Sequence, residues 1–584
     1  MRQRSGALRS LTMAVMAVLM LFVSACTAQA ATYSFPYPSA PTKKGLYVCP
    51  GMEEDALELG IRHTTINLSV GDFMPDAAYR NKTHCVPYVY EGTTYWFSKA
   101  SLEQYDNELG ILSKNNVLVT AILLLPRRTD NLKYLISPAA RGKSANYYQW
   151  NMNNPKAVRA LKAIVTFFQK RYSNRNGARI VGWIVGNEVN NSSIWNWAGY
   201  VSADTYMDQY AAQVAEVYRA ARSVYSNARI YISLDHYWSA SNGSYWYAGK
   251  DILKKFAARM KKKGLNGGKW CIAYHPYNIS QYEPNIMSSS AAVTNKASTR
   301  IITMKNLKVL TKYVKKHYSK KCRIILSEQG YSSVTAGSDT SKEQARNIAL
   351  AYYIAQQNSM VDALILHRQV DHTGEGERYG LYTSWGGENA AWQKPSWTAY
   401  KYADTTRVDQ YTKYAAKRAK KISGKKVKKY YTVSKGKLTR TKAPSWSLDY
   451  TDHFAPFGAL TGFQLENGVY YLNHDYARNP NVPWGMNRSR VIRAKKYKKF
   501  GFGIHVTSSL SGSATVYLRL WSGSKKYLDA SARVPCGVDN YLCVNLSKWS
   551  ARKKITRVEI LIRPYEAGWK KKTSARIFSV GIGK

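Results

Sequence analysis

The regular alternation of short β-rich runs with amphipathic helical patterns most limits what this chain can fold into. From residue 45 onward, each apolar run is followed by a stretch whose apolar side chains recur at helical spacing. The β-rich runs cover residues 45–48, 63–68, 117–125, 179–185, 229–234, 270–273, 323–326 and 361–366. The helical patterns cover residues 53–59, 102–112, 155–172, 211–224, 252–263, 302–318, 343–357 and 395–403.

Eight strand–helix pairs are typical of a (β/α)₈ barrel, so we predict an α/β fold with this TIM barrel in residues 31–404. An open, doubly wound sheet is the alternative. That fold usually has a glycine-rich phosphate turn after its first strand, and Cys49-Pro50-Gly51 is not such a turn. In a barrel, functional side chains are expected at the carboxyl ends of the strands and in the loops that follow.

The chain changes character after residue 404. Residues 405–444 contain fourteen Lys or Arg and one acidic residue, Asp409, which predicts a lysine-rich linker. The alternative is an electrostatic tether to anionic wall polymers or lipid headgroups. Residues 445–584 contain short β-rich runs separated by Gly, Ser and Asn turns, which predicts an all-β, jelly-roll-like sandwich.

The first thirty residues have the order of a secretory signal peptide. Three arginines precede an apolar stretch at residues 11–23, and small residues follow. Two processing routes fit: cleavage before Ala31, which removes residues 1–30, or a lipobox whose cysteine, Cys26, becomes lipidated. Both routes predict a chain that is secreted or attached to the cell surface. No apolar run after residue 25 approaches the roughly 20 residues that span a bilayer, so no transmembrane segment is predicted in the mature chain.

The charge balance indicates an anionic neighbour. Lys and Arg outnumber Asp and Glu by 86 to 36, which gives a formal net charge of +50. Such a charge suits nucleic acid, an acidic polysaccharide or an anionic cell surface. Because the chain is predicted to be exported, nucleic acid is not expected as a partner.

Six cysteines besides Cys26 would meet an oxidising environment after export. The close pair Cys536 and Cys543 suits a bridge across a hairpin, and Cys271 and Cys322 begin neighbouring predicted strands. Buried free thiols are the alternative. The Cys and His spacings match no zinc motif, so no metal and no cofactor are predicted.

Two predicted strands end in glutamate. The fourth strand runs into Asn187-Glu188, and the seventh runs into Ser327-Glu328. A barrel brings the carboxyl ends of its strands to one rim, so the two carboxylates are expected to face a common centre. Glycoside hydrolysis needs two such carboxyl groups, one to protonate the leaving oxygen and one to attack or to activate water. For a single glutamate at a strand end, a structural ion pair is the alternative.

This pattern resembles the clan A retaining glycoside hydrolases, barrels that include cellulases, β-mannanases, β-xylosidases and β-galactosidases. The resemblance covers about residues 45–403 and implies that Glu188 is the acid/base and Glu328 the nucleophile. It also implies that Asn187 binds the sugar 2-hydroxyl. The His-x-Tyr that many members carry on strand six is matched by His275-Pro276-Tyr277, and the resemblance implies that Tyr277 hydrogen-bonds the nucleophile.

Two strand ends depart from the clan pattern. Many members have Arg at the mouth end of strand two, where this chain has Asn67, and many end strand eight in Trp, where this chain has His367 and Arg368. We expect these three residues to contact substrate. Arg368 either engages a carboxylate-bearing sugar or, as we favour, neutralises the two glutamates. These departures affect the identity of the sugar more than the type of reaction.

Further rim residues complete the expected substrate site. Asp235 and His236 end strand five, Trp238 follows them, and Trp385 lies beyond strand eight. The loops after strands four, five and eight contain six tryptophans, of which we expect two or three to stack against sugar rings. Packing against the barrel is the alternative for each one.

The sequence therefore predicts a secreted hydrolase that cleaves β-linked poly- or oligosaccharides with retention. A non-catalytic glycan-binding or wall-associated protein on the same scaffold is the alternative. The C-terminal sandwich resembles jelly-roll modules appended to such hydrolases, many of which bind carbohydrate, and a purely structural domain is its alternative. Its tryptophans are Trp446, Trp484, Trp521, Trp549 and Trp569.

Overall fold

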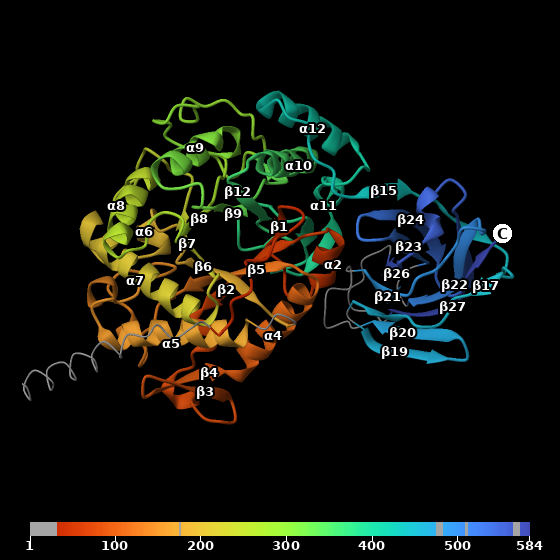
Figure 1. Cartoon of the computed structure of the whole chain (residues 1–584), viewed down its shortest axis with the longest axis horizontal. Coiled ribbons are helices and arrows are strands. Elements are labelled where there is room, and N and C mark those ends of the chain that lie inside the picture. Colours follow the sequence, from red (N-terminus) through yellow and green to blue (C-terminus); the bar gives the residue numbers. More distant parts are fainter. Residues whose placement is uncertain (1–31, 174–176, 459, 475–482, 509–511, 565–572) are drawn as a thin grey trace, which may run out of the picture.

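The computed structural model describes residues 32–173, 177–458, 460–474, 483–508, 512–564 and 573–584. The predicted signal peptide with Cys26, and Trp569, lie outside these residues. The described chain forms a barrel and a smaller β-sandwich side by side (Figure 1). Among the described residues, none of the helices combines the length and apolar character needed to cross a bilayer.

The barrel is closed by eight parallel strands, which confirms the predicted fold class. Around the barrel the strand order is β1-β12-β9-β8-β7-β6-β5-β2. Their bounds are β1 Lys44–Leu46, β2 His63–Ser69, β5 Leu118–Leu124, β6 Ile180–Val185, β7 Arg229–Leu234, β8 Cys271–Tyr274, β9 Ile324–Gln329 and β12 Val361–Leu366. Most of these strands are buried on both faces, as their continuous apolar runs predict; all seven residues of β5 are buried.

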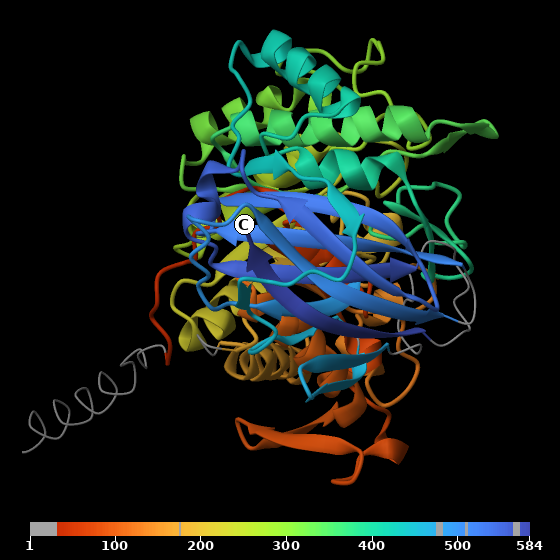
Figure 2. The ribbon, with the colours of Figure 1, turned by 90° about the vertical axis from the view of Figure 1, so that its right-hand side faces the viewer.

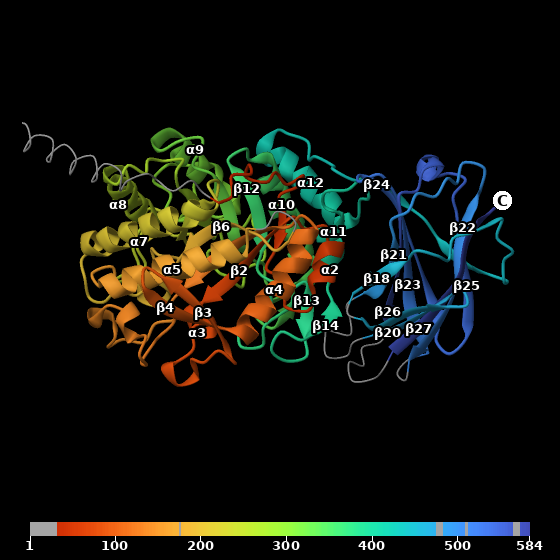
Figure 3. The same ribbon diagram turned by 60° about the horizontal axis from the view of Figure 1, so that its bottom comes forward.

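Helices cover the outside of the barrel (Figure 3). The main ones are α2 Glu53–Glu58, α4 Lys99–Lys114, α5 Pro155–Arg171, α7 Ala203–Val224, α8 Gly249–Lys262, α9 Lys308–His317, α10 Ser341–Gln357 and α11 Pro395–Tyr402. Local sequence sets where they begin. In α5, the Asn154 side chain accepts a hydrogen bond from the Lys156 N–H, and Pro155 occupies the first turn, where no N–H is needed.

Three hairpins interrupt the alternation that the sequence predicts, and the shortest, β10 Val334–Thr335 with β11 Ser338–Asp339, lies between β9 and α10. The strands β3 Cys85–Tyr90 and β4 Thr93–Ser98 pair between β2 and α4, and they extend away from the rest of the barrel (Figure 2). The Phe97 ring of β4 stacks on Phe167 of α5 at 4.0 Å, which attaches this hairpin to the barrel. The third hairpin, β13 Tyr382–Ser384 with β14 Ala390–Gln393, follows β12.

The C-terminal region is a sandwich of two sheets, as predicted. One sheet has the order β15-β24-β23-β26-β21-β18, and the other has the order β16-β25-β22-β27-β20-β19 with β17 paired to β27. The strands are β15 Thr432–Lys435, β16 Leu438–Thr441, β17 Leu448–Asp449, β18 Ala455–Phe457, β19 Leu460–Glu466, β20 Val469–His474, β21 Trp484–Arg488, β22 Lys499–Ser508, β23 Ser513–Ser522, β24 Lys526–Pro535, β25 Asp539–Asn545, β26 Arg557–Pro564 and β27 Thr573–Gly583. Trp484 and Trp549 are buried in its core.

Residues 405–444 form regular structure, which corrects the expectation of a linker. The helix α12 Gln410–Ser423 begins at a capping box between Asp409 and Thr412, and it packs on α10. Its Ala415 and Ala419 are fully buried, whereas most of its basic side chains face solvent. Strand β15 then pairs with β24 in one sheet of the sandwich, and strand β16 pairs with β25 in the other. The high proportion of basic residues drew attention away from a narrow apolar face, formed by Ala415 and Ala419, that is sufficient to dock the helix.

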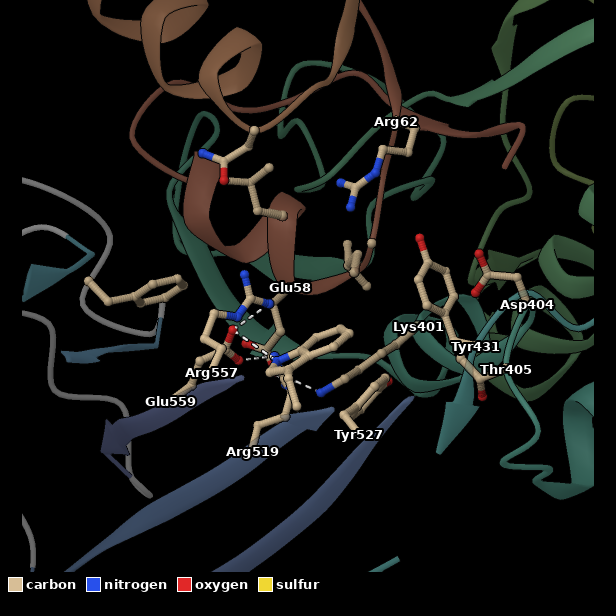
Figure 4. A pocket seen from close by; sticks show the side chains of 16 residues that line it. Glu58, Arg62, Lys401, Asp404, Thr405, Tyr431, Arg519, Tyr527, Arg557 and Glu559 are labelled. Carbon is tan, nitrogen blue, oxygen red and sulfur yellow. Dashed lines mark hydrogen bonds and ion pairs between the residues drawn. The ribbon is translucent and has the colours of Figure 1, made fainter. Parts of the chain in front are cut away.

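Buried charges join the barrel to the sandwich. Glu58 and Lys401 of the barrel lie 2.7 Å apart and point toward Arg519, Arg557 and Glu559 of the sandwich (Figure 4). Arg519 pairs with Glu559 at 2.8 Å and with Glu58 at 3.3 Å, so a single guanidinium bridges the two bodies. The cavity that these side chains line has a volume of about 120 Å³.

The described cysteines are all free, so of the two alternatives that the sequence left open the structure has free thiols and not bridges. Cys271 and Cys322 are buried, and Cys536 and Cys543 are partly exposed. Cys543 lies within β25, and Cys536 follows the end of β24. Closeness in sequence did not bring their sulfurs together, because β24 belongs to one sheet of the sandwich and β25 to the other.

Candidate active site

The acid/base candidate Glu188 lies just beyond the carboxyl end of β6. The strand ends at Val185, and the chain then turns through Gly186 and Glu188, whose φ angles are 73° and 35°. Left-handed backbone is unusual for a residue with a side chain and indicates a locally imposed conformation. The Ser233 hydroxyl of β7 accepts a hydrogen bond from the Glu188 N–H at 2.9 Å, which fixes this turn.

The nucleophile candidate Glu328 lies in β9, and two residues from the β8 end face it. The Tyr277 hydroxyl donates to Glu328 Oε1 at 2.8 Å, the contact that the resemblance implies. His275 Nδ1 lies 2.8 Å from Glu188 Oε1 and 3.8 Å from Glu328 Oε2. The two carboxylate oxygens are therefore at most 6.6 Å apart, the sum of those distances. The structure brings both glutamates together around one imidazole.

The electrostatics favour an ionised Glu328. Burial alone would raise its pKa, but the imidazoles of His275 and His367 and the Tyr277 hydrogen bond lower the pKa below its usual value. Burial would lower the pKa of His275, yet the carboxylates of Glu328 and Glu188 raise it. His275 Nε2 lies 3.1 Å from the Ser327 hydroxyl, so both ring nitrogens have partners.

The residues that follow β7, Asp235 and His236, are buried and hydrogen-bond to other residues around the candidate site. Asp235 is buried and accepts hydrogen bonds from Asn190 Nδ2 at 2.5 Å, the Tyr237 N–H at 2.8 Å and Trp246 Nε1 at 2.6 Å. Burial and the nearby Glu188 charge raise the pKa of Asp235 above its usual value. His236 is also buried, and its Nδ1 lies 3.0 Å from the Tyr277 carbonyl oxygen. These contacts give Asp235 and His236 a positioning role.

The strand-eight residues meet partners that sequence reasoning missed. Arg368 pairs with Glu388 at 2.6 Å and with Glu375 at 3.4 Å, which corrects our expectation that it neutralises the two catalytic candidates. His367 Nε2 lies 3.8 Å from Glu375 Oε1. Both acids lie in the segment after β12. The several charged residues of that segment were the sequence signal from which ionic partners for Arg368 could have been predicted.

The strand-two and strand-four amides lie at the same end of the barrel. Asn67 of β2 is partly exposed, and its Nδ2 donates to the Tyr47 hydroxyl at 3.4 Å. Asn187 is partly exposed beside Glu188. Tyr47, which follows β1, also lies under the Arg368 guanidinium at 5.7 Å, and sequence reasoning did not identify it. Among the described residues, no three His, Cys, Asp or Glu side chains gather as a possible metal site.

The aromatic residues divide into buried and exposed groups. Trp238 is 0% exposed and packs edge-on against Tyr313 of α9, so it does not meet substrate as expected. Its burial depends on a helix distant in sequence. Trp385 is 46% exposed and Trp392 is 51% exposed, and their rings lie 6.0 Å apart at the β13–β14 hairpin. This exposed pair is available for stacking.

Several solved structures resemble the chain at low identity. They include a β-glucosidase from Pyrococcus furiosus, with 14% identity, a TM-score of 0.41 and coverage of 63% of this chain and 86% of that one. A glucosidase from Croceicoccus marinus has 11% identity, a TM-score of 0.40 and coverage of 94% and 98%. GH5_18 from Bifidobacterium longum subsp. longum has 13% identity, a TM-score of 0.40 and coverage of 68% and 83%. We base the functional argument on the geometry of the site.

The family comparison covers the barrel and α12. No curated protein matches the sequence. The model described as Family of unknown function (DUF5722) matches residues 36–428, so it extends over the barrel and α12 and ends before β15. Since that match spans more than half of the sequence, the chain belongs to this family of unknown function.

Proposed function

We propose that this protein is a retaining glycoside hydrolase that acts on β-linked poly- or oligosaccharides. The observation that carries the proposal is the pair of carboxylates, Glu188 and Glu328, at most 6.6 Å apart around His275. Retaining enzymes place their two carboxyl groups ~5–5.5 Å apart, and inverting enzymes place them ~6.5–9.5 Å apart to admit a water. The upper limit given by His275 for one pair of oxygens includes the whole retaining range and only the short end of the inverting range.

In the first step, Glu328 attacks the anomeric carbon and the glycosidic C–O bond breaks. Glu188, in its protonated form, donates its proton to the departing oxygen, and a glycosyl ester forms on Glu328. The Tyr277 hydroxyl holds Glu328 Oε1, which leaves Oε2 to make the new bond. The lowered pKa of Glu328 keeps the attacking carboxylate ionised.

In the second step, water replaces the sugar on Glu328. Glu188, now a carboxylate, accepts a proton from the water as the water oxygen attacks the anomeric carbon, and the ester bond to Glu328 breaks. His275 orients Glu188 through its 2.8 Å contact in both steps. The cycle returns both carboxyl groups to their starting protonation states.

The surroundings support a glycan as substrate. The exposed Trp385 and Trp392 offer ring faces on which sugar C–H faces can stack. The signal-like residues 1–30 support action outside the cell, either free or anchored through Cys26.

The test combines turnover with covalent trapping. Purified protein is assayed on a panel of β-glycans and aryl β-glycosides, with Glu328→Gln and, as a matched control, Glu103→Gln on the exposed face of α4. We expect turnover that falls about a thousandfold or more in Glu328→Gln and stays unchanged in Glu103→Gln. A 2-fluoro glycoside of the preferred sugar should add its glycosyl mass to the peptide that contains Glu328.

Two outcomes would contradict the proposal. Turnover without an adduct, and with inverted anomeric configuration of the product, would exclude the retaining mechanism. Binding of glycans with no turnover across the panel would favour the alternative, a non-catalytic glycan-binding protein.

A further inference from the structure

A second hollow lies on the flank of the barrel, and none of the residues that line it belongs to the candidate active site. It has a volume of about 610 Å³. We call it the lysine groove; α9, the loop before it and the end of α12 line it, through Met287, Asn295, Ala297, Lys305, Lys308, Val309, Lys312, Tyr313, Lys316, His317 and Ile422. In Figure 1, α9 and α12 lie along the same upper edge of the barrel.

The lining of the lysine groove is positively charged, with no Asp or Glu in it. Lys308, Lys312 and Lys316 follow one another at intervals of four residues, so their Cα atoms recur every ~6 Å along one face of α9. The two bordering helices repeat this bias: α9 contains four Lys, α12 contains five Lys or Arg, and neither contains an acid. Like charges at this spacing repel one another, so a bound anion would reduce the electrostatic repulsion between the lysines.

Two of the lysines, the partly buried Lys305 and the exposed Lys308, donate hydrogen bonds to the wall of the groove. Lys305 Nζ donates to the Ser288 carbonyl at 3.0 Å, and Lys308 Nζ donates to the Ile422 carbonyl at 3.1 Å, which ties α9 to the end of α12. Lys312 and Lys316 are exposed. The groove therefore has a fixed frame with two ammonium groups available to a ligand.

The groove also contains a braced aromatic pair. Tyr313 and His317 have ring centroids 4.3 Å apart, and Tyr313 is half-buried. Behind it, the fully buried Trp238 packs edge-on at 5.1 Å and holds the tyrosine ring in place. An apolar ring surface beside ammonium groups matches a sugar that presents both C–H faces and a carboxylate.

We propose that the lysine groove binds an acidic polysaccharide with one carboxylate per sugar unit. The regular spacing of lysines along α9 suits a linear polymer whose charge repeats, and the Tyr313–His317 pair suits a sugar ring. Lysine ammonium groups pair with carboxylate and phosphate alike, so the choice of a carboxylate polymer rests on the ring pair and on the predicted export of the chain, and phosphate polymers and nucleic acid are comparison probes in the test. The groove gives a location to the electrostatic attachment that was the alternative interpretation of residues 405–444.

The experiment measures binding of a defined-length oligogalacturonate to the full chain in the Glu328→Gln background, which separates binding from turnover. The variant is Lys312→Glu with Lys316→Glu. The matched control is Lys254→Glu with Lys261→Glu, a pair of equal charge change on the exposed face of the neighbouring helix α8. We expect affinity to fall roughly tenfold or more in the groove variant, with little change in the control.

The carboxyl-reduced oligosaccharide, inorganic polyphosphate and single-stranded DNA are the comparison probes. Weak binding of all three, together with a salt dependence that flattens in the groove variant, would support the proposal. Equal losses in the groove and control variants would overturn it, because they would reflect net charge alone. Tighter binding of polyphosphate or DNA would overturn the assignment to acidic polysaccharide, and equal binding of the carboxyl-reduced probe would exclude a role for the lysines.

Discussion

Replacing Arg519 by Met is expected to uncouple the sandwich from the barrel. Arg519 is almost fully buried and contacts three carboxylates, Glu559 at 2.8 Å, Glu58 at 3.3 Å and Asp529 at 3.8 Å. Glu58 belongs to the barrel helix α2, and the other two belong to the sandwich. Met fills most of the same space but carries no charge, so the change removes the Arg519 bridge while largely preserving packing. Other ion pairs between the bodies remain, among them Asp55–Arg563 at 3.4 Å and Arg407–Asp529 at 3.2 Å.

The expected loss is about 3 kcal/mol of stability. Removing one partner of a buried ion pair costs ~3–5 kcal/mol, because the remaining charge is left without compensation. The lower end applies, since Lys401 stays 2.7 Å from Glu58 and Arg557 stays 2.8 Å from Glu559. For a body of this size, about 3 kcal/mol lowers the melting temperature by roughly 6–12 °C.

The loss should depend on pH with a definite sign. Burial would raise the pKa values of Glu58 and Asp529, but Arg519 and Lys401 hold both below their usual values. Carboxylates with depressed pKa values stabilise the folded state above their unfolded pKa values, and that stabilisation disappears as the pH falls through the folded values. The difference between wild type and Arg519→Met should therefore be full near pH 7 and shrink in acid.

Calorimetry of the full chain tests this expectation. The wild type should unfold with the two bodies coupled, whereas Arg519→Met should show an earlier, separate transition for the sandwich. Arg440→Met, at an exposed position on β16, is the matched control and should behave as wild type. The double variant with Glu559→Gln should regain part of the loss. An Arg519→Met curve that matches the control at pH 7 would refute the coupling.

Two further predictions concern the active site. Tyr277→Phe removes a hydrogen bond that lowers the pKa of Glu328, so the acid limb of the kcat/KM profile on an aryl glycoside should move to higher pH; an unmoved limb would contradict the role given to Tyr277. Replacing both Trp385 and Trp392 by Ala should raise KM for oligosaccharides roughly fivefold, because stacking of about 1 kcal/mol is lost, while kcat and the melting temperature stay constant. A fall in kcat with unchanged KM would argue against a binding role.

Sequence reasoning located the two glutamates because their positions depend on local rules. Glu188 and Glu328 end or follow apolar strands, and barrel closure alone brings such positions to one rim. The closed barrel itself followed from eight repeats of one pattern. These features need no knowledge of which distant side chains meet.

The failures concern contacts between distant segments. Trp238 packs against Tyr313 of α9, and Arg368 is engaged by Glu375 and Glu388 from the loop after β12. The docking of α12 depends on two alanines within a basic segment. Neither periodicity nor composition reports such pairings.

The strands that follow α12 have a consequence for where the chain can be divided. β15 is the outermost strand of one sheet and β16 is the outermost strand of the other, so residues 432–441 close one margin of both. A fragment that begins at residue 445 would leave β24 and β25 with open backbone N–H and C=O groups, which invite aggregation. During synthesis the barrel and α12 leave the ribosome first, these two strands follow, and the rest of the sandwich comes last. A sandwich produced as a separate fragment must therefore begin before Thr432, inside the basic segment that the sequence predicted to be a linker.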